Sequence, residues 1–446
     1  MTAAVGLGVL AACYALTLAA GTPNGARWVL LALLGLSWAS FALAARVLLR
    51  APARLAVPLL VAGGLLLQTL AVSAAPRSTD DFYRYAWDGR VQAAGVDPYR
   101  YPPTDPALAD LRDEWLFPGG QTRLNHPDVP TVYPPVAQAW FLAVHALSPV
   151  GARHKPWQLA AALLAMATTF TLVGLLRWAG GDPRLAVLWA WSPTAVLEAG
   201  NSAHVDVLGA LLVVLALWAV AARRSAAGGA LFGAAVAVKL LPALVLPAAL
   251  RHRGMVVLAA ATGLFGLSYL PHVLAVGPGV LGFLPGYLGE EGYGAGSRFA
   301  LLRIALPDGA APLAAAAILA ATAALTVRRA DPGRPWHAAL PLVGVAFLLA
   351  APNYPWYATL LVILVALTGR AEWLAVAAAA YPVYLAGALD LSHATTQQIS
   401  YGTALLVLAG TTALAYRRSY QHLIRWRPAQ SETKPTSISS RPPRRT

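Results

Sequence analysis

A short run of acidic and aromatic residues, from Asp80 to Gln92, has the composition of a site for acid and base chemistry. If this run is helical, polar side chains recur on one face at intervals of about one turn. The residues of that face are Asp81, Tyr85, Asp88 and Gln92, with Arg84 beside them. A carboxylate held there can accept a proton from a substrate hydroxyl, as a general base does.

The same residues also have a purely structural interpretation. Ser78 or Thr79 followed by acidic residues is a typical helix N-terminus, in which a side-chain oxygen caps the first turn and negative charge complements the helix dipole. An isolated pair such as Asp80 and Asp81 is more often a cap than a catalytic group. The aromatic residues that follow favour the catalytic interpretation, and both interpretations stay open on the sequence.

These residues interrupt a chain that is otherwise apolar. Of its 446 residues, 58% are hydrophobic and 12% are charged, which leaves too little polar surface to cover a soluble globule. Apolar runs recur from end to end, and a helix of about 20 such residues crosses a bilayer. We therefore predict an all-α, polytopic transmembrane helical bundle of about 12 spans, within a range of about 11 to 14.

The segment 76–134 is the longest polar interruption, and it contains nine of the 19 acidic residues. Loops longer than about 15 residues are usually functional or disordered. The aromatic content of this loop argues against disorder. We expect an amphipathic helix that starts just after the membrane and ends near Gly95, inside an extracytoplasmic catalytic loop.

The net charge of +14 comes from short joints between apolar runs and from a basic tail. This is the pattern of cytoplasmic loops in a membrane protein, and it argues against binding of nucleic acid. It predicts a multi-pass protein of the inner (plasma) membrane with both termini in the cytoplasm. The predicted parts are three helices in 1–75, the external loop 76–134, the remaining helices in 135–416 with an external loop at 275–308, and a disordered basic cytoplasmic tail at 417–446.

Two apolar segments do not fit a simple crossing. Val136 to Leu147 is short for a span, so we expect a half-helix or an interfacial helix there, and Pro156 to Leu176 as the crossing helix. The segment 227–250 begins and ends beside basic residues and is interrupted by Lys239 and Pro242. It is therefore either two short spans or a re-entrant pair.

Three motifs of the loop are specific enough to compare with known families. They are Asp80-Asp81-Phe82-Tyr83-Arg84-Tyr85-Ala86-Trp87-Asp88-Gly89-Arg90, Gly95-Val96-Asp97-Pro98-Tyr99 and Tyr133-Pro134-Pro135. The chain resembles the polyprenyl-phosphate-sugar-dependent glycosyltransferases of the GT-C superfamily, most closely the integral-membrane alpha-mannosyltransferases of actinobacteria. A fainter resemblance is to the GPI-anchor mannosyltransferases.

The resemblance implies that an acidic residue early in the first large external loop is the catalytic base. Asp80 and Asp81 both match that position. Asp81 is the first choice because it would share its helical face with Tyr85 and Asp88. The sequence does not decide between the two carboxylates.

Other candidates for substrate binding lie at predicted external edges or inside spans, where ionisable side chains are costly. Lys239 resembles the family's lysine-containing break and could meet a lipid phosphate, although a lysine at that depth can also snorkel to a headgroup. Arg298 could grip a phosphate through two parallel hydrogen bonds. The predicted substrate-binding residues are Tyr85, Trp87, Asp88, Arg84, Tyr133, His204, Asp206, Lys239, Arg298, Asn353 and Tyr357.

Most of these candidates have a structural alternative. Tyr85, Trp87 and Tyr133 could stack on a sugar or simply pack the loop onto the bilayer. The turn from Asn353 to Tyr357 could line the site, or its aromatic side chains could anchor the protein at the membrane interface. Glu198, His204 and Asp206 could form a polar turn that faces water.

No metal cofactor is expected, although a divalent metal stays an alternative. His126 and Asp128 could join the Asp80–Asp81 pair, but their spacing matches no common ligand motif. The single cysteine, Cys13, excludes a disulfide framework and a Cys-based metal site.

The expected side of the site restricts the donor, because nucleotide sugars are made in the cytoplasm. We expect a hexosyltransferase that takes a sugar from a polyprenyl-phosphate-linked donor, inverts its anomeric carbon and glycosylates a cell-envelope glycolipid, glycan or protein. Mannose follows from the resemblance alone. The alternatives are a transporter or lipid flippase, and a polysaccharide polymerase or ligase. Membrane lipids are the other expected partners.

Overall fold

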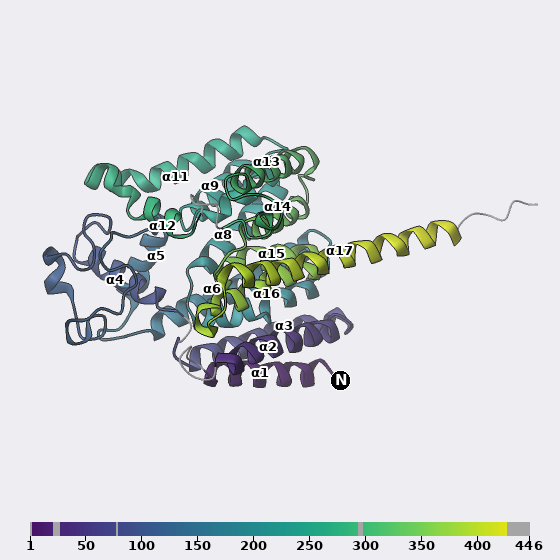
Figure 1. Cartoon of the computed structure of the whole chain (residues 1–446), viewed down its shortest axis with the longest axis horizontal. Coiled ribbons are helices and arrows are strands. Elements are labelled where there is room, and N and C mark those ends of the chain that lie inside the picture. Colours follow the sequence, from purple (N-terminus) through teal and green to yellow (C-terminus); the bar gives the residue numbers. More distant parts are fainter. Residues whose placement is uncertain (1, 21–26, 77–78, 293–297, 426–446) are drawn as a thin grey trace, which may run out of the picture.

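The structure is a computed structural model that describes residues 2–20, 27–76, 79–292 and 298–425, without the side chains of 415–425. The described residues form helices and turns, with no strand among them. Figure 1 shows most helices lying side by side in one bundle, with the segment that contains α4 (Asp81–Ala93) and α5 (Pro135–Leu147) at one end.

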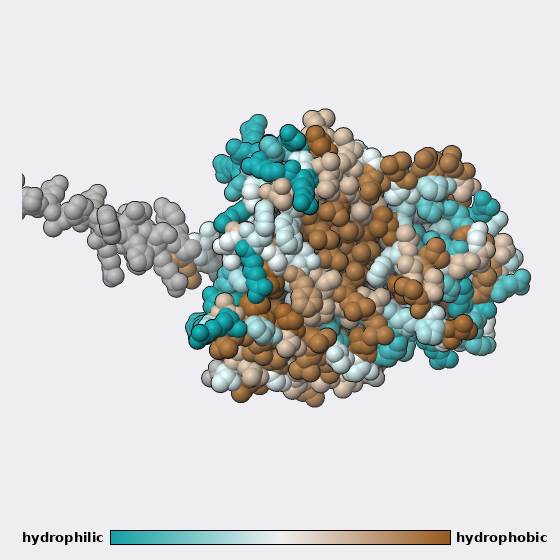
Figure 2. Space-filling model, turned by 180° about the vertical axis from the view of Figure 1, so that it is seen from behind, coloured by the Kyte–Doolittle hydropathy of each residue, from teal (hydrophilic) through white to brown (hydrophobic). Residues whose placement is uncertain are grey.

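Six helices of the described residues are long and apolar enough to cross a membrane. They are α1 (Ala3–Ala20), α2 (Arg27–Leu48), α3 (Ala53–Ser73), α6 (Lys155–Trp178), α11 (Gly254–Val276), which runs on through short turns and α12 (Leu284–Glu290), and α13 (Ala311–Arg329). Figure 2 shows a continuous hydrophobic surface between hydrophilic patches at the two ends of the molecule. The predicted all-α polytopic membrane bundle is therefore confirmed.

Shorter apolar helices complete the bundle. They are α8 (Asp206–Ala221), α9 (Ser225–Val236), α14 (Trp336–Ala350), α15 (Thr359–Thr368) and α16 (Leu374–Leu385). The last described helix, α17 (His393–Arg425), continues well past residue 416, where the tail was expected to begin. The rest of that expected tail, 426–446, lies outside the described residues.

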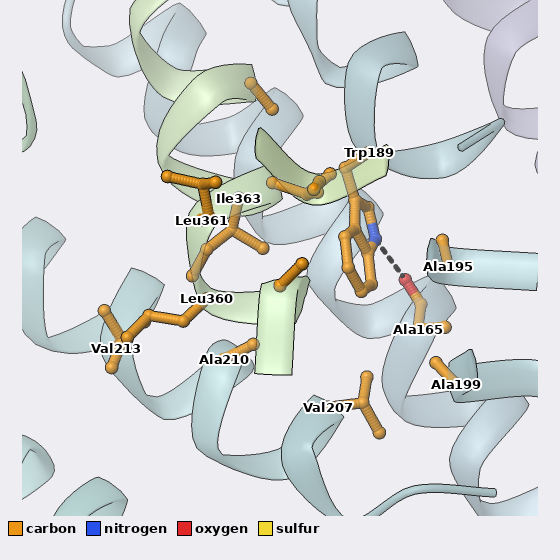
Figure 3. Packing of buried hydrophobic residues seen from close by; sticks show 14 of the residues in the cluster. Ala165, Trp189, Ala195, Ala199, Val207, Ala210, Val213, Leu360, Leu361 and Ile363 are labelled. Carbon is orange, nitrogen blue, oxygen red and sulfur yellow. Dashed lines mark hydrogen bonds between the residues drawn. The ribbon is translucent and has the colours of Figure 1, made fainter. Parts of the chain in front are cut away.

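The centre of the bundle contains backbone that is not α-helical. The short helix α7 (Val187–Ala190) is followed by a π-helix, η4 (Thr194–Asn201). The Trp189 indole donates a hydrogen bond of 3.1 Å to the carbonyl of Ala165, and small residues of α6 and α8 pack around it (Figure 3). Irregular backbone is tolerated at membrane depth only where protein surrounds it, and π-helical turns often mark functional sites.

The loop between α3 and α6 is folded around two helices that pack against one another. As predicted, α4 is an amphipathic helix that ends two residues before Gly95, and α5 is too short for an ordinary span. Two 3₁₀ turns, Pro106–Leu111 and Pro118–Gly120, lie between them. The Val136 amide at the start of α5 donates a hydrogen bond of 2.9 Å to the carbonyl of Ala237. This bond attaches the loop to the bundle.

Ala237 belongs to a break in the bundle that the sequence also predicted. Helix α9 ends at Val236, and helical structure resumes in the 3₁₀ turn Leu241–Val245 and α10 (Leu246–Ala249). Lys239 stands between these two pieces. Val238, the residue before Lys239, lies close to Gly209 of α8. The early end of α9 therefore leaves Lys239 beside the first turns of α8.

Gly89 sets the closeness of α4 and α5. A Cβ atom added at Gly89 would lie 2.6 Å from the carbonyl oxygen of Phe141. We predict that Gly89→Ala forces the helices apart, costs about 1–3 kcal/mol and lowers the thermal unfolding temperature in detergent. The control is Gly263→Ala in α11, where a Cβ atom meets nothing within 4 Å. Equal unfolding temperatures for the two variants would contradict the tight α4–α5 contact.

Candidate active site

Asp81 lies where the loop between α3 and α6 meets the bundle. It is the first residue of α4, and its side chain is 14% exposed. One carboxylate oxygen, Oδ2, is 3.4 Å from Nδ1 of His204, and the other, Oδ1, accepts a hydrogen bond of 2.8 Å from Nδ2 of Asn125. The N-terminus of α4 adds a favourable dipole. These contacts orient the carboxylate toward residues of the bundle.

Asp80 has a different environment although it is the neighbouring residue. Its Oδ1 also accepts a hydrogen bond from Asn125, at 3.3 Å, but its side chain forms no cap hydrogen bond. The Thr79 hydroxyl instead accepts a hydrogen bond of 3.2 Å from the Asp81 amide. The capping role expected for the acidic pair is therefore not seen at Asp80.

The two carboxyl groups differ in electrostatics. Burial raises the pKa of Asp80, and the charge of Asp81 raises it further. Burial alone would also raise the pKa of Asp81, but His204, Lys239 and Asn125 outweigh it, so that the net pKa lies below the usual value. At a given mildly acidic pH, Asp81 is the more fully ionised of the pair.

His204 occupies the centre of the site, with 1% of its side chain exposed. Its ring stacks on Trp356 at a centroid distance of 4.0 Å and an angle of 18°. Trp356 in turn stacks on Tyr354 at 4.7 Å. The second ring nitrogen of His204, Nε2, is 3.7 Å from a carboxyl oxygen of Glu198. The turn from residue 353 to 357 thus lines the site through Trp356.

Lys239 and Asp206 form an ion pair beside this histidine. The Lys239 ammonium donates hydrogen bonds of 3.0 Å and 2.9 Å to the two carboxylate oxygens of Asp206. It also lies 4.5 Å from the centre of the Tyr357 ring, whose hydroxyl bonds the Tyr287 hydroxyl. The Lys239 side chain is 22% exposed, so the ammonium is partly accessible.

Tyr85 and Tyr133 are the loop tyrosines that lie near Asp81 and Asp206. The Tyr85 ring stacks on Phe141 at 4.5 Å, and Tyr133 meets its edge at 5.2 Å. Burial raises the pKa of both tyrosines well above the usual value, and the charges of Asp81 and Asp206 act in the same direction. Their hydroxyls therefore stay protonated as hydrogen-bond donors.

Arg84 and Asp88 have a structural role in this arrangement. Asp88 accepts hydrogen bonds from Arg84 at 3.0 Å, Thr131 at 2.7 Å and Gln138 at 2.9 Å. Arg84 also donates to the carbonyls of residues 126 and 129, both at 3.1 Å. This buried clamp fixes the returning end of the loop to α4. The substrate-binding role predicted for the two residues gains no support from these contacts.

Three other predicted substrate-binding residues have partners away from Asp81. Trp87 is buried against Phe117 inside the loop, with the ring centroids 5.1 Å apart. Arg298 is buried and paired with Glu291. Asn353 accepts a hydrogen bond of 2.8 Å from Gln397 of α17. In the described contacts Trp87 packs only against other loop residues. Arg298 and its partner Glu291 act electrostatically on Tyr354 of the site.

The two residues that could join Asp80 and Asp81 in a metal site, His126 and Asp128, have partners elsewhere. His126 lies 3.8 Å from Glu290, and Asp128 accepts a hydrogen bond of 2.9 Å from Thr104. In the described ranges no cluster of three His, Cys, Asp or Glu side chains is arranged to hold a metal ion. Catalysis without a metal stays a prediction.

Sequence reasoning missed Asn125, which binds both carboxylates from more than 40 positions away. No local pattern marks it, because it stands in irregular loop. Tyr287, which bonds Tyr357, was also missed. The sequence marks Tyr287 only as an aromatic residue in a Gly-rich segment.

Comparison with known families supplies one match. The family model described as Alpha-(1->6)-mannopyranosyltransferase, N-terminal domain, matches residues 7–253, which is 247 of the 446 residues. The matched region contains Asp81, His204, Asp206 and Lys239. Searches of curated proteins and of solved structures gave no match.

The clamp predicts a contrast between two aspartates of the loop. Asp88→Ala leaves Arg84 buried without its counter-charge, so we expect a loss of about 3–5 kcal/mol in the free energy of unfolding. Asp113→Ala breaks the more exposed pair with Arg90 and should cost at most about 1 kcal/mol. Chemical denaturation in detergent measures both losses. Similar losses for the two variants would show that the clamp does not hold the loop.

Proposed function

The chain belongs to the alpha-(1->6)-mannopyranosyltransferase family, and on that premise we propose that it transfers mannose from a polyprenyl-phosphate donor to a cell-envelope acceptor at the extracytoplasmic membrane surface. The protein is a mannosyltransferase of the membrane. We propose its donor class, its acceptor, the side of the membrane on which it acts and its mechanism.

The observation that supports it most is the position of Asp81 between a folded polar loop and an apolar bundle. A donor with a polyprenyl chain keeps that chain in the bilayer and its phosphate at the surface. Asp81 lies at the junction that such a phosphate would reach, with His204 and the Lys239 ammonium on the bundle side. A base and a cation thus share one junction.

Asp81 is the proposed general base. It accepts the proton of the acceptor hydroxyl while that oxygen bonds to the anomeric carbon of mannose. The bond from this carbon to the phosphate oxygen breaks, and its electron pair leaves with the phosphate. Attack from the opposite face inverts the anomeric carbon, so the α product named by the family requires a β-linked donor. The α-(1->6) linkage, if this chain shares it, makes the attacking group a 6-hydroxyl.

Lys239 is the proposed partner of the donor phosphate. Its ammonium has three N–H groups, and the contacts to Asp206 use two of them. The phosphate gains charge as it leaves, and a cation already in place stabilises that charge. Tyr357 holds the ammonium from the side through its ring. Arg298 is a second cation of the external segment, for which phosphate must compete with Glu291.

The distribution of charge supports an extracytoplasmic site. Basic residues lie at the joints between helices at the end of the bundle away from α4, among them Arg46, Arg177, Arg223, Arg253 and Arg328. Such residues favour the cytoplasmic side. A lipid-linked donor is then required because nucleotide sugars do not reach the other side. The acceptor is a glycolipid, a glycan or a protein with an accessible sugar hydroxyl.

The base assignment predicts that Asp81→Asn lowers transfer by about 10²–10⁴-fold. Asp80→Asn should keep activity within about tenfold of wild type, because Asp81 remains. Transfer of radiolabelled mannose from polyprenyl-phosphate-mannose in proteoliposomes measures both, with Asp110→Asn on the exposed part of the loop as the control. Wild-type transfer by a correctly inserted Asp81→Asn variant would overturn the assignment.

The pH dependence separates the two carboxylates further. The base is active as a carboxylate, so activity falls as the pH drops through its pKa. Since the pKa of Asp81 is lowered and that of Asp80 raised, an Asp81 base keeps the enzyme active to a more acidic pH than an Asp80 base would. Asp80→Asn removes a neighbouring negative charge, so an acid limb set by Asp81 should persist in that variant and move, if it moves, to lower pH. Loss of the limb in that variant would favour Asp80.

For the donor site we predict that Lys239→Met raises the donor KM by about 10–100-fold, which corresponds to one charge-assisted hydrogen bond. Lys155→Met is the matched control, because Lys155 binds the carbonyl of Ser73 at the same end of the bundle but outside the site. The double variant Lys239→Met, Asp206→Asn leaves no unpaired buried charge. If the double variant folds well and binds donor normally, Lys239 has no role in donor binding.

A further inference from the structure

His204 lies between two buried carboxyl groups that come from different parts of the chain. Its Nδ1 is 3.4 Å from Asp81 of the loop, and its Nε2 is 3.7 Å from Glu198 of the π-helix η4. The Glu198 side chain is 5% exposed. Each ring nitrogen therefore lies near one carboxyl oxygen, and neither nitrogen forms a hydrogen bond of standard geometry with a described residue.

The backbone fixes Glu198 and His204 relative to one another. The amide of His204 donates a hydrogen bond of 3.2 Å to the carbonyl of Glu198. Ala203, just before the histidine, has φ +59°, a left-handed conformation that costs energy for a residue with a Cβ atom. The wide turns of the π-helix bring Glu198 to this position. The strained turn at Ala203 thus holds the Glu198 carboxyl near one ring nitrogen of His204.

We propose that Glu198 is a positioning residue for the transfer reaction: its carboxylate holds the His204 ring with Nδ1–H directed at Asp81, and thereby orients the carboxylate that accepts the proton of the attacking hydroxyl. This inference rests on the proposed function of Asp81. Glu198 itself touches neither substrate, because the histidine stands between it and Asp81. Its effect on the reaction passes through His204.

The arrangement explains how the base can be buried and still ionised. A buried carboxylate needs donors, and Asp81 has Asn125 on one oxygen and His204 on the other. A neutral histidine has only one N–H, which can reside on either nitrogen. The proposed arrangement therefore needs a proton on each ring nitrogen, one directed at Glu198 and one directed at Asp81. When Asp81 takes the substrate proton, the Glu198–His204 pair keeps its own protons and charges unchanged.

Other charged and titratable groups face this trio from the neighbouring elements. Asp206 of α8 and Lys239 of the 237–240 break act on it from one side, and largely compensate one another through their ion pair. Asp80 of the loop interacts electrostatically with Asp81. The Tyr381 hydroxyl of α16 lies beside Glu198. None of these groups stands between Nε2 of His204 and Glu198.

The test uses Glu198→Gln, which keeps the shape of the side chain and removes its charge. We expect kcat to fall about 10–100-fold while the donor KM stays within about twofold of wild type. Asp81 loses part of the donor that lowers its pKa, so its pKa rises and the acid limb of the pH profile moves up by about one pH unit. The measurement is mannose transfer by full-length enzyme in proteoliposomes from pH 4 to pH 8, a range of about four units.

The control is Glu372→Gln, a conservative change at the far end of the bundle, where Glu372 pairs with Arg370. It should leave kcat, KM and the acid limb unchanged. The thermal unfolding temperature of each variant shows whether a loss of activity comes from misfolding. If Glu198→Gln does not fold, Glu198→Asp retains the charge at a greater distance and should show a smaller loss of kcat with a smaller shift of the limb.

A double-mutant cycle with His204→Asn tests whether Glu198 acts through the histidine. We expect Glu198→Gln to change kcat by less than about twofold in the His204→Asn background. The proposal would be overturned if folded Glu198→Gln kept the wild-type acid limb. It would also be overturned if the fold-losses of kcat caused by the two substitutions simply multiplied in the double variant. Full activity of Asp81→Asn would instead overturn the proposed function, so the two failures are distinguishable.

Discussion

The contact between the Asp81 carboxylate and the His204 ring joins the loop between α3 and α6 to the membrane bundle, and the rest of the site is arranged around it. A carboxylate cannot be taken out of water at the end of an apolar bundle unless donors and cations replace the lost hydration. His204, Asn125 and Lys239 do so for Asp81. The loop must therefore dock in one register, with α4 against the turn that carries His204.

Several buried polar contacts away from the chemistry hold that register. The Arg84–Asp88 clamp fixes residues 126–131 to α4. Asp97 bonds His272 of α11 at 2.8 Å, which attaches the loop to the bundle at a second place. The hydrogen bond from the first turn of α5 to the carbonyl of Ala237 is a third attachment. Ala237 lies two residues before Lys239. Loop docking and placement of the cation are thus physically linked.

The membrane explains where the chain departs from regular helices. The bundle is interrupted at the π-helix that carries Glu198, which is buried throughout, and at the break that carries Lys239, which is buried at Ala237 and Val238. Exposure of such backbone to lipid would leave unpaired N–H and C=O groups. Positions where this cost is met can carry ionisable side chains at the depth of a lipid phosphate. The break at Lys239 therefore serves both the chain path and the proposed donor site.

Helical periodicity and hydropathy were enough to predict the membrane bundle, the amphipathic helix with Asp81, the short α5 and the break at Lys239. These features depend on residues close together in sequence. The sequence did not separate Arg84 and Asp88, which stabilise the loop, from Asp81 on nearby turns of the same helix. It also missed Asn125, since its position depends on how irregular loop packs across more than 40 residues. Spacing defines a helical face but does not specify its tertiary partner.

The most direct test of the site is a cryo-EM structure of the full-length enzyme in nanodiscs with a polyprenyl-phosphonate analogue of the donor. In this analogue a methylene group replaces the oxygen between the anomeric carbon of mannose and the phosphorus, so the sugar cannot be transferred. The account predicts phosphonate density within hydrogen-bond distance of the Lys239 ammonium, with the anomeric carbon on the side of Asp81. The structure offers a clear alternative location: an apolar groove of about 580 Å³ between α2 and α16, bordered by Arg46 and Arg50 at the opposite end of the bundle. Phosphonate density in that groove, with none beside Lys239, would contradict the proposed site.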